Sequence, residues 1–118
     1  MFLHDFVTSS IVIVAYDLAN GKIQLSENAD EVLGFDVKTS FGNSSLDFVK
    51  KFLHNDDFET FMLAISSAKE TMKPSICTVK CVSGKDLSEY KEFTITVQCI
   101  LNHLGQPTRF QCILIPVQ

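Results

Sequence analysis

Residues 26–35 read Ser-Glu-Asn-Ala-Asp-Glu-Val-Leu-Gly-Phe, and this stretch has the features of a short helix with a defined start and end. Asn28 suits the N-cap, and Glu31 follows three positions later, at the spacing of a capping box. Gly34 stands where the helix should end, because glycine adopts a left-handed conformation without steric cost. Three apolar residues share the face that we expect to point inward: Ala29, Val32 and Leu33.

Two strands joined by a turn are expected before this helix. Residues 11–16 are apolar and rich in β-branched side chains, which favours a buried strand. Asn20 and Gly21 form a strong hairpin signal, because a type I′ turn needs positive φ at both central residues. Residues 22–26 then alternate between apolar and polar, so the sequence predicts an N-terminal hairpin.

Two further helices are expected in the middle of the chain. Residues 46–53 have apolar side chains at helical spacing, and residues 54–56 interrupt the pattern. Asp56 with Glu59 resembles a second capping box, which begins a longer helix that Pro74 ends. The inward stripe of this helix is predicted to comprise Phe58, Phe61, Met62, Ile65, Ala68 and Met72.

The last third of the chain has the pattern of three strands. Residues 75–82, 93–101 and 109–117 are strand-like and are joined by short polar turns, which predicts an antiparallel meander. Strands, helices and strands in this order predict an α+β fold, with one antiparallel sheet and the helices on one face. We expect one domain over 1–118, with 1–9 as an N-terminal cap segment and 10–118 as its core.

Three local motifs, in this order, resemble the PAS family of sensory domains. Residues 26–35 are similar to the family's segment after its second strand, which ends in Leu-Gly-Phe or Leu-Gly-Tyr. Residues 52–57, Phe-Leu-His-Asn-Asp-Asp, resemble its His-Pro-x-Asp stretch, with Asn55 where proline often stands. Residues 102–107, with Gly-x-Pro, are similar to the turn before its last strand. The resemblance covers essentially the whole chain.

The resemblance implies a five-stranded sheet of order 2-1-5-4-3 with helices around a small cavity. Family members sense small molecules, light or redox state, or they dimerise and relay signals between domains. We therefore expect a sensory module of a bacterial signalling protein, which relays a signal to an attached output domain such as a histidine kinase. Residues 115–118 lack the family's Asp-Ile-Thr-like ending, and the sequence does not identify the output domain.

Charge and hydropathy exclude some partners. The formal net charge is -4 and the basic residues are scattered, so we expect no nucleic-acid binding. No run approaches the roughly 20 apolar residues that cross a bilayer, so we expect no membrane contact. No signal peptide is visible, and a cytoplasmic location is expected.

The sequence contains no residue pattern that is typical of a cofactor site, a metal site or a catalytic site. Flavin adducts in this family would need a cysteine near residues 44–53, and haem often uses a histidine on the long helix; neither is present. Cys77 and Cys81 lie about 13 Å apart along a strand, too far to ligate one zinc ion at about 2.3 Å. We interpret Asp56, Asp57 and Glu59 as helix-start acids and His54 as a capping or packing group. We expect no metal, no cofactor and no enzyme, with an unidentified small ligand left open.

Two groups of apolar residues carry the functional hypotheses. In a domain this small we favour an ordinary core over a ligand-filled cavity. Such a cavity would be lined by the inner faces of the fourth and fifth strands, among them Val97 and Cys99, and by Phe35, Phe48, Phe52, Phe61, Met62 and Ile65. The first and last strands are apolar on both faces, although a solvated sheet face should be polar. Residues 1–7 would supply the cover as a short helix that folds over its own sheet or over a neighbour's. The partner hypothesis that we prefer is a homodimer through Phe2, Phe6, Ile113 and Ile115. The alternative is a protein-interaction or structural dimerisation domain without ligand.

Overall fold

The computed structural model describes residues 10–37, 45–84 and 87–117. The predicted cap segment 1–9, with Phe2 and Phe6, lies outside these residues. The elements follow the expected order of strands, helices and strands: β1 (Val12–Asp17), β2 (Ile23–Leu25), α2 (Ala29–Leu33), α4 (Ser45–Phe52), the 3-10 turn η1 (Asn55–Asp57), α5 (Phe58–Thr71), β3 (Ser75–Ser83), β4 (Glu89–Leu101) and β5 (Pro107–Pro116).

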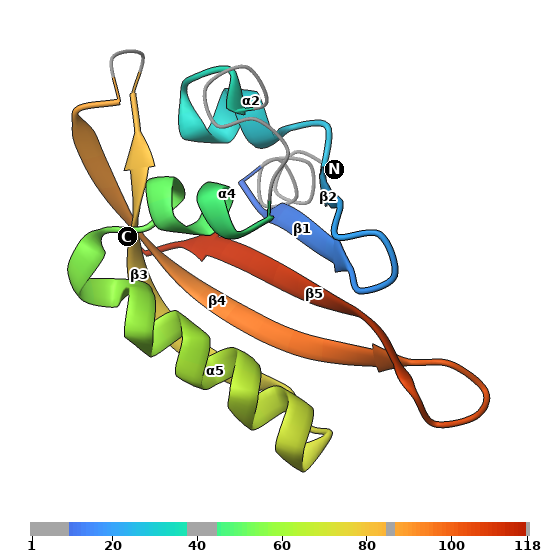
Figure 1. The fold of residues 1–118 in the computed structure, drawn as a ribbon. Helices are drawn as coiled ribbons and strands as arrows, with labels where there is room; N and C mark the ends of the chain where they lie inside the picture. The colour runs from blue at the N-terminus through green and yellow to red at the C-terminus, as the bar shows by residue number, and fades with distance from the viewer. Residues whose placement is uncertain (1–9, 38–44, 85–86, 118) are drawn as a thin grey trace, which may run out of the picture.

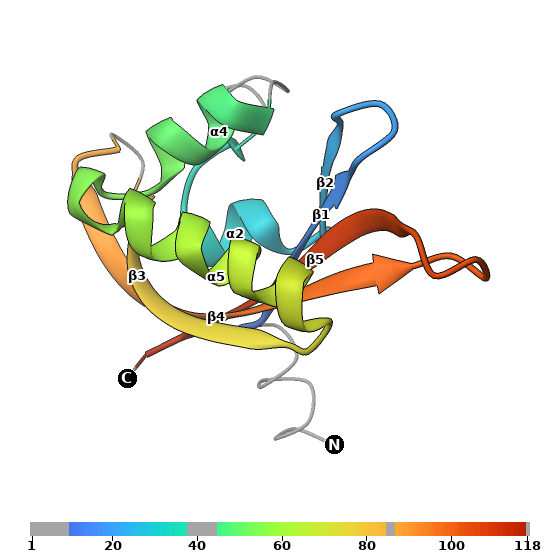
Figure 2. The same ribbon diagram turned by 60° about the horizontal axis from the view of Figure 1, so that its bottom comes forward.

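The five strands form one antiparallel sheet in the order β2-β1-β5-β4-β3. The first strand of the chain, β1, therefore pairs with the last strand, β5, in the middle of the sheet (Figure 1). Figure 2 shows α2, α4 and α5 on the same side of the sheet. The predicted α+β fold, its strand order and its one-sided helical layer are confirmed.

The core forms where alternate strand side chains meet these helices. The inner side chains of β4 and β5 are buried: Phe93, Ile95, Val97, Phe110, Cys112 and Leu114. The helices contribute buried side chains that include Leu33, Phe48, Phe52, Phe61 and Ala68. Because strand side chains alternate between faces, each buried residue of β4 and β5 is followed by one on the outer side of the sheet.

Helix α5 differs from its predicted inward stripe at two methionines. Its buried residues are Phe61, Ala64 and Ala68, whereas Met62 is 38% exposed. One residue along a helix turns by about 100°, so Met62 points away from the line that Phe61 and Ala68 define. Met72, 52% exposed, has left-handed φ and ends the helix.

The N-terminal hairpin is confirmed, but its turn is not the predicted type I′. Gly21 has φ 70°, whereas Asn20 does not have positive φ. The backbone N–H of Gly21 donates to the Asp17 carbonyl at 2.8 Å, and the Asp17 carboxylate accepts from the N–H of Ala19 at 2.8 Å. The aspartate side chain thus organises a wider turn, which needs positive φ only at its glycine.

Asn28 does not cap α2 with its side chain. Its Nδ2 donates to the Ile11 carbonyl at 2.8 Å, and its Oδ1 accepts from Ser26 Oγ at 2.7 Å. Ser26 Oγ in turn accepts the backbone N–H of Ile13 at 3.0 Å. Strand β2 has only three residues and does not reach the start of β1. The side chains of Ser26 and Asn28 therefore make the hydrogen bonds there that the backbone of a longer strand would have made.

We expect Asn28→Ala to lower the free energy of unfolding by about 1–3 kcal/mol, because partly buried polar groups lose their partner. The matched control is Asn20→Ala, which removes a 2.9 Å hydrogen bond to Lys22 in an exposed turn and should cost less than about 0.5 kcal/mol. Urea denaturation followed by circular dichroism measures both. Equal losses in the two variants would contradict this role for Asn28.

Candidate functional site

An apolar cavity of about 40 Å³ lies between the sheet and the helices α4 and α5. Three of its lining residues come from α4, one follows α4 directly, one comes from α5, and the rest come from β1, β2, β4 and β5. They are Val14, Ile23, Phe48, Val49, Phe52, Leu53, Phe61, Ile95, Cys112 and Leu114. Amphipathic spacing in α4 and strand alternation in the sheet therefore supply its two walls.

The structure brings three of the predicted cavity residues together and places the others elsewhere. Phe48, Phe52 and Phe61 line the cavity. Phe35 and Val97 are buried but do not line it. Ile65 and Cys99 are half-buried against the core outside it, and Met62 is exposed.

Of the remaining lining residues, Ile95, Cys112 and Leu114 were predicted only as part of the inner faces of the fourth and fifth strands, and Val14, Ile23, Val49 and Leu53 were not predicted. Val14, Cys112 and Leu114 sit on the inner faces of two neighbouring central strands, with Val14 paired to Cys112. Strand alternation does place these side chains on the helix side, and that signal was available in the sequence. Which inner-face residues border a void depends on how α4 packs, which the alternation pattern does not specify.

The described residues that line the cavity include no acid, base or ionised nucleophile. Among them, Cys112 is the single residue with a side-chain atom other than carbon. Burial, with a smaller contribution from Cys77, raises the pKa of Cys112 to about 12. At neutral pH the Cys112 side chain is therefore a protonated thiol, which is not the reactive form of cysteine.

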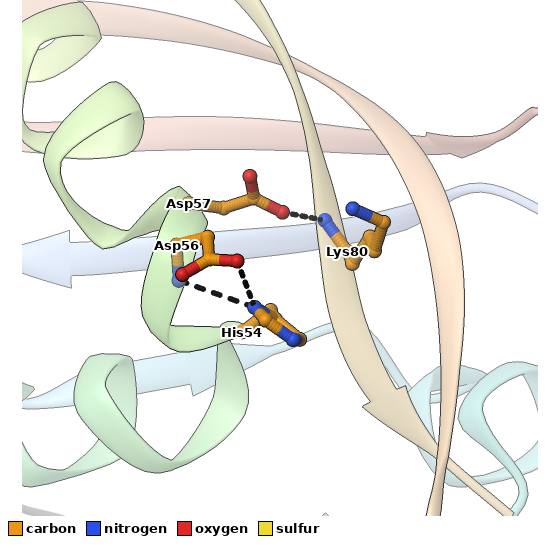
Figure 3. Close-up of polar contacts among 4 residues, drawn as sticks. All are labelled: His54, Asp56, Asp57 and Lys80. Carbon is orange, nitrogen blue, oxygen red and sulfur yellow. Dashed lines mark hydrogen bonds and ion pairs between the residues drawn. The ribbon is translucent and has the colours of Figure 1, made fainter.

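Polar contacts among His54, Asp56, Asp57 and Lys80 join the segment between α4 and α5 to the edge strand β3, and these contacts are called the clasp (Figure 3). The backbone N–H of His54 donates to the Lys80 carbonyl at 2.9 Å, and Asp57 Oδ2 accepts the Lys80 backbone N–H at 2.7 Å. His54 Nδ1 accepts from the N–H of Asp56 at 3.1 Å. The clasp follows directly after Phe52 and Leu53, so it fixes the end of the cavity wall against β3.

The clasp changes one predicted role and confirms another. Asp56 and Glu59 do not begin α5 with a capping box, because the residue before α5 is Asp57, which makes no side-chain cap. The Asp57 carboxylate instead binds the sheet edge. His54 caps the short turn η1, as the capping interpretation predicted, and its ring lies edge-on to Tyr90 with centroids 4.7 Å apart.

The described residues hold neither a metal-ligand cluster nor a membrane-spanning helix. Within 10–37, 45–84 and 87–117, no three His, Cys, Asp or Glu residues are grouped so that they could hold a metal ion. No helix in this part of the chain is long and apolar enough to cross a membrane. Cys81 is buried, and burial, with smaller contributions from Asp57 and Cys77, raises the pKa of its thiol.

The outer face of the sheet carries a row of isoleucines in β3, β5 and β1, with a threonine at the β4 position. Strand pairing aligns Ile76 with Thr96, Thr96 with Ile113, and Ile113 with Ile13. Ile113 is half-buried, whereas Ile13 is 39% and Ile76 is 68% exposed. Ile115, farther along β5, is 44% exposed. These five residues, Ile13, Ile76, Thr96, Ile113 and Ile115, are called the outer row below.

Solved structures share this fold at low sequence identity. A sensory box histidine kinase/response regulator from Burkholderia thailandensis superposes with a TM-score of 0.71 at 15% identity, over 98% of this chain and 83% of that one. The N-terminal domain of a diguanylate cyclase with a PAS/PAC sensor from Marinobacter aquaeolei gives 0.69 at 10% identity, over 90% and 94% of the two chains.

A third similar structure comes from an animal. Drosophila melanogaster Cycle PAS-B with bound ethylene glycol superposes with a TM-score of 0.69 at 16% identity, over 90% of this chain and 99% of that one. No protein-family model and no curated protein sequence matches the chain. The chain therefore has the fold of a PAS domain.

We expect Asp57→Ala to lower the free energy of unfolding by about 1–2 kcal/mol, because the Lys80 N–H loses a charged acceptor. Hydrogen exchange of the Lys80 amide should become roughly tenfold faster, as the sheet edge opens more readily. The control is Asp56→Ala: this side chain is 84% exposed and 3.7 Å from His54, so its loss should change little. An unchanged Lys80 exchange rate in Asp57→Ala would contradict the clasp.

The Cys112 thiol predicts a loss of stability in alkali. Its pKa is 9.0 in the unfolded chain and about 12 in the folded one, so the folded state holds its proton more tightly. Stability from this group is complete below the lower value and falls as the pH rises above it, by up to about 1.4 kcal/mol per pH unit. In Cys112→Val the fall of the unfolding free energy above pH 9.0 should be shallower. Parallel pH profiles of the two proteins would refute this.

Proposed function

We propose that this chain is a sensory module of a bacterial signalling protein, which dimerises through its outer row and relays a signal to an attached output domain such as a histidine kinase. The observation that carries the proposal is the outer row itself. The solved histidine kinase and diguanylate cyclase structures with the same fold support the signalling role. The proposed setting is the cytoplasm.

The outer row is apolar enough that we expect another protein surface to bury it. Antiparallel sheets that face water usually alternate between an apolar inner face and a polar outer face. Here β1 and β5, at the centre of the sheet, also place isoleucines outside, at Ile13, Ile113 and Ile115. An apolar band at the middle of a sheet favours a partner, and a second copy of the chain presents the same band.

The cavity and the outer row share the same strands, which supports a relay between them. Cys112 and Leu114 line the cavity, and Ile113, between them, belongs to the outer row. In β1, Val14 lines the cavity and Ile13 is its neighbour in the outer row. A shift of either strand on ligand binding therefore moves both surfaces, because packed strands move as units.

The small volume of the cavity supports a module that binds no large cofactor and catalyses no reaction. Drug- and cofactor-sized sites occupy about 300–1,000 Å³, whereas this cavity holds about 40 Å³. The described residues of its walls include no pair of an acid and a base, which general acid-base catalysis requires. The same small volume favours the second candidate function, a dimerisation domain that binds no ligand.

We expect Ile113→Glu to convert the dimer to a monomer, because the charge would be buried without a partner at the centre of the interface. The matched control is Leu63→Glu, an equally drastic change at a residue of α5 that is 70% exposed on the opposite layer. Light scattering gives the mass of each variant, and circular dichroism checks the fold. A dimer that survives Ile113→Glu, or a monomeric parent protein, would exclude this interface.

A further inference from the structure

The chemistry of the cavity walls restricts what the cavity can hold. A void of about 40 Å³ has room for a water molecule, since about 10–15 Å³ on the same measure is enough. A buried water also needs two to four polar partners, and genuinely empty cavities are apolar. Of the ten described residues that line it, nine have hydrocarbon side chains and the tenth is Cys112, so water gains little by entering.

We propose that this cavity binds a small, uncharged molecule without hydrogen-bonding groups, in the size class of dioxygen or xenon. The proposal rests on the sensory function proposed above and names the ligand class of its cavity. An apolar protein cavity of about 150 Å³ takes up benzene or xenon. At about 40 Å³ this cavity is smaller, so it selects ligands of one or a few heavy atoms.

Dispersion supplies the attraction in such a site. The aromatic wall includes Phe48 and Phe52, whose ring centroids lie 5.4 Å apart at an angle of 37°. The opposite wall carries Cys112, a soft and polarisable side chain. Individual contacts contribute only about 0.1–0.2 kcal/mol, but a ligand that fills the void makes many of them.

The same walls select against polar ligands. A hydroxyl group that enters without a hydrogen-bond partner loses about 1–3 kcal/mol relative to water. Ethylene glycol carries two hydroxyl groups, and among the described lining residues only the weakly polar thiol of Cys112 can bond them. The site should thus prefer xenon to ethylene glycol. A comparison of the two ligands distinguishes binding that depends on ligand polarity from the entry of any molecule that is small enough.

The test uses xenon dissolved in a solution of the full chain, observed by the methyl resonances of the protein. We expect saturable shifts confined to the methyl groups of Val14, Ile95 and Leu114, which line the cavity. Ethylene glycol at the same concentration should leave these resonances unchanged.

Matched variants test the location. Val49→Ile adds one methylene group to the cavity wall and should weaken xenon binding several-fold. Val32→Ile makes the same change at a half-buried residue of α2 that does not line the cavity, and it should bind xenon as the parent does. Val14→Ile fills the cavity from the sheet side and should repeat the effect of Val49→Ile.

The outcomes are distinct from those of the dimer experiment. Absence of selective methyl shifts, equal xenon affinity in Val49→Ile and Val32→Ile, or tighter binding of ethylene glycol would each overturn the ligand class. None of these results alters the mass of the Ile113→Glu variant. A failed xenon experiment with a dimer that depends on Ile113 therefore rejects this ligand class and leaves the dimerising relay module in place.

Discussion

The alternation of side chains along β1 and β5 is the constraint on which the rest of the structure depends. These strands occupy the centre of the sheet, and each residue that faces the helices is followed by one that faces away. A slip of one residue in their pairing would exchange Cys112 with Ile113, and so exchange the cavity wall with the outer row. The register Ile13 to Ile113 therefore fixes both surfaces at once.

Side chains complete the hydrogen bonding at both sides of this sheet, where backbone pairing is incomplete. Beyond the short strand β2, Ser26 and Asn28 bond the backbone at the start of β1. On the far edge, Asp57 and the His54 backbone bond Lys80 in β3. Unpaired strand edges recruit other chains, so such contacts protect an edge. They also bind α2 and α5 to the sheet, which keeps the helical layer in position over the core.

Sequence patterns predicted the fold well because its determinants are local and periodic. Alternation in the strands and the glycine at Gly34 were enough to place elements in order, and Gly34 does end α2 with φ 85°. Long-range partners were not predictable in the same way. Asn28 was predicted as a helix cap and Asp57 as a helix-start acid. Asn28 instead bonds the residue before β1, and Asp57 bonds Lys80 in β3, and both partners are distant in sequence. Only three of the eight residues named for the cavity line it, because the position of a void depends on the tilt of a whole helix.

The cavity has a stability cost that bears on its role. An unfilled apolar volume destabilises a core by about 24 cal/mol per Å³, or about 1 kcal/mol for a void of this size. The fold does not require that loss, since one larger side chain such as isoleucine at Val49 would reduce it. PAS-type folds host many functions, so the fold alone does not explain the void. The described lining of this cavity is apolar except for one thiol and lies partly on the strands that carry the outer row, and the small apolar ligand proposed above would offset the cost of the cavity.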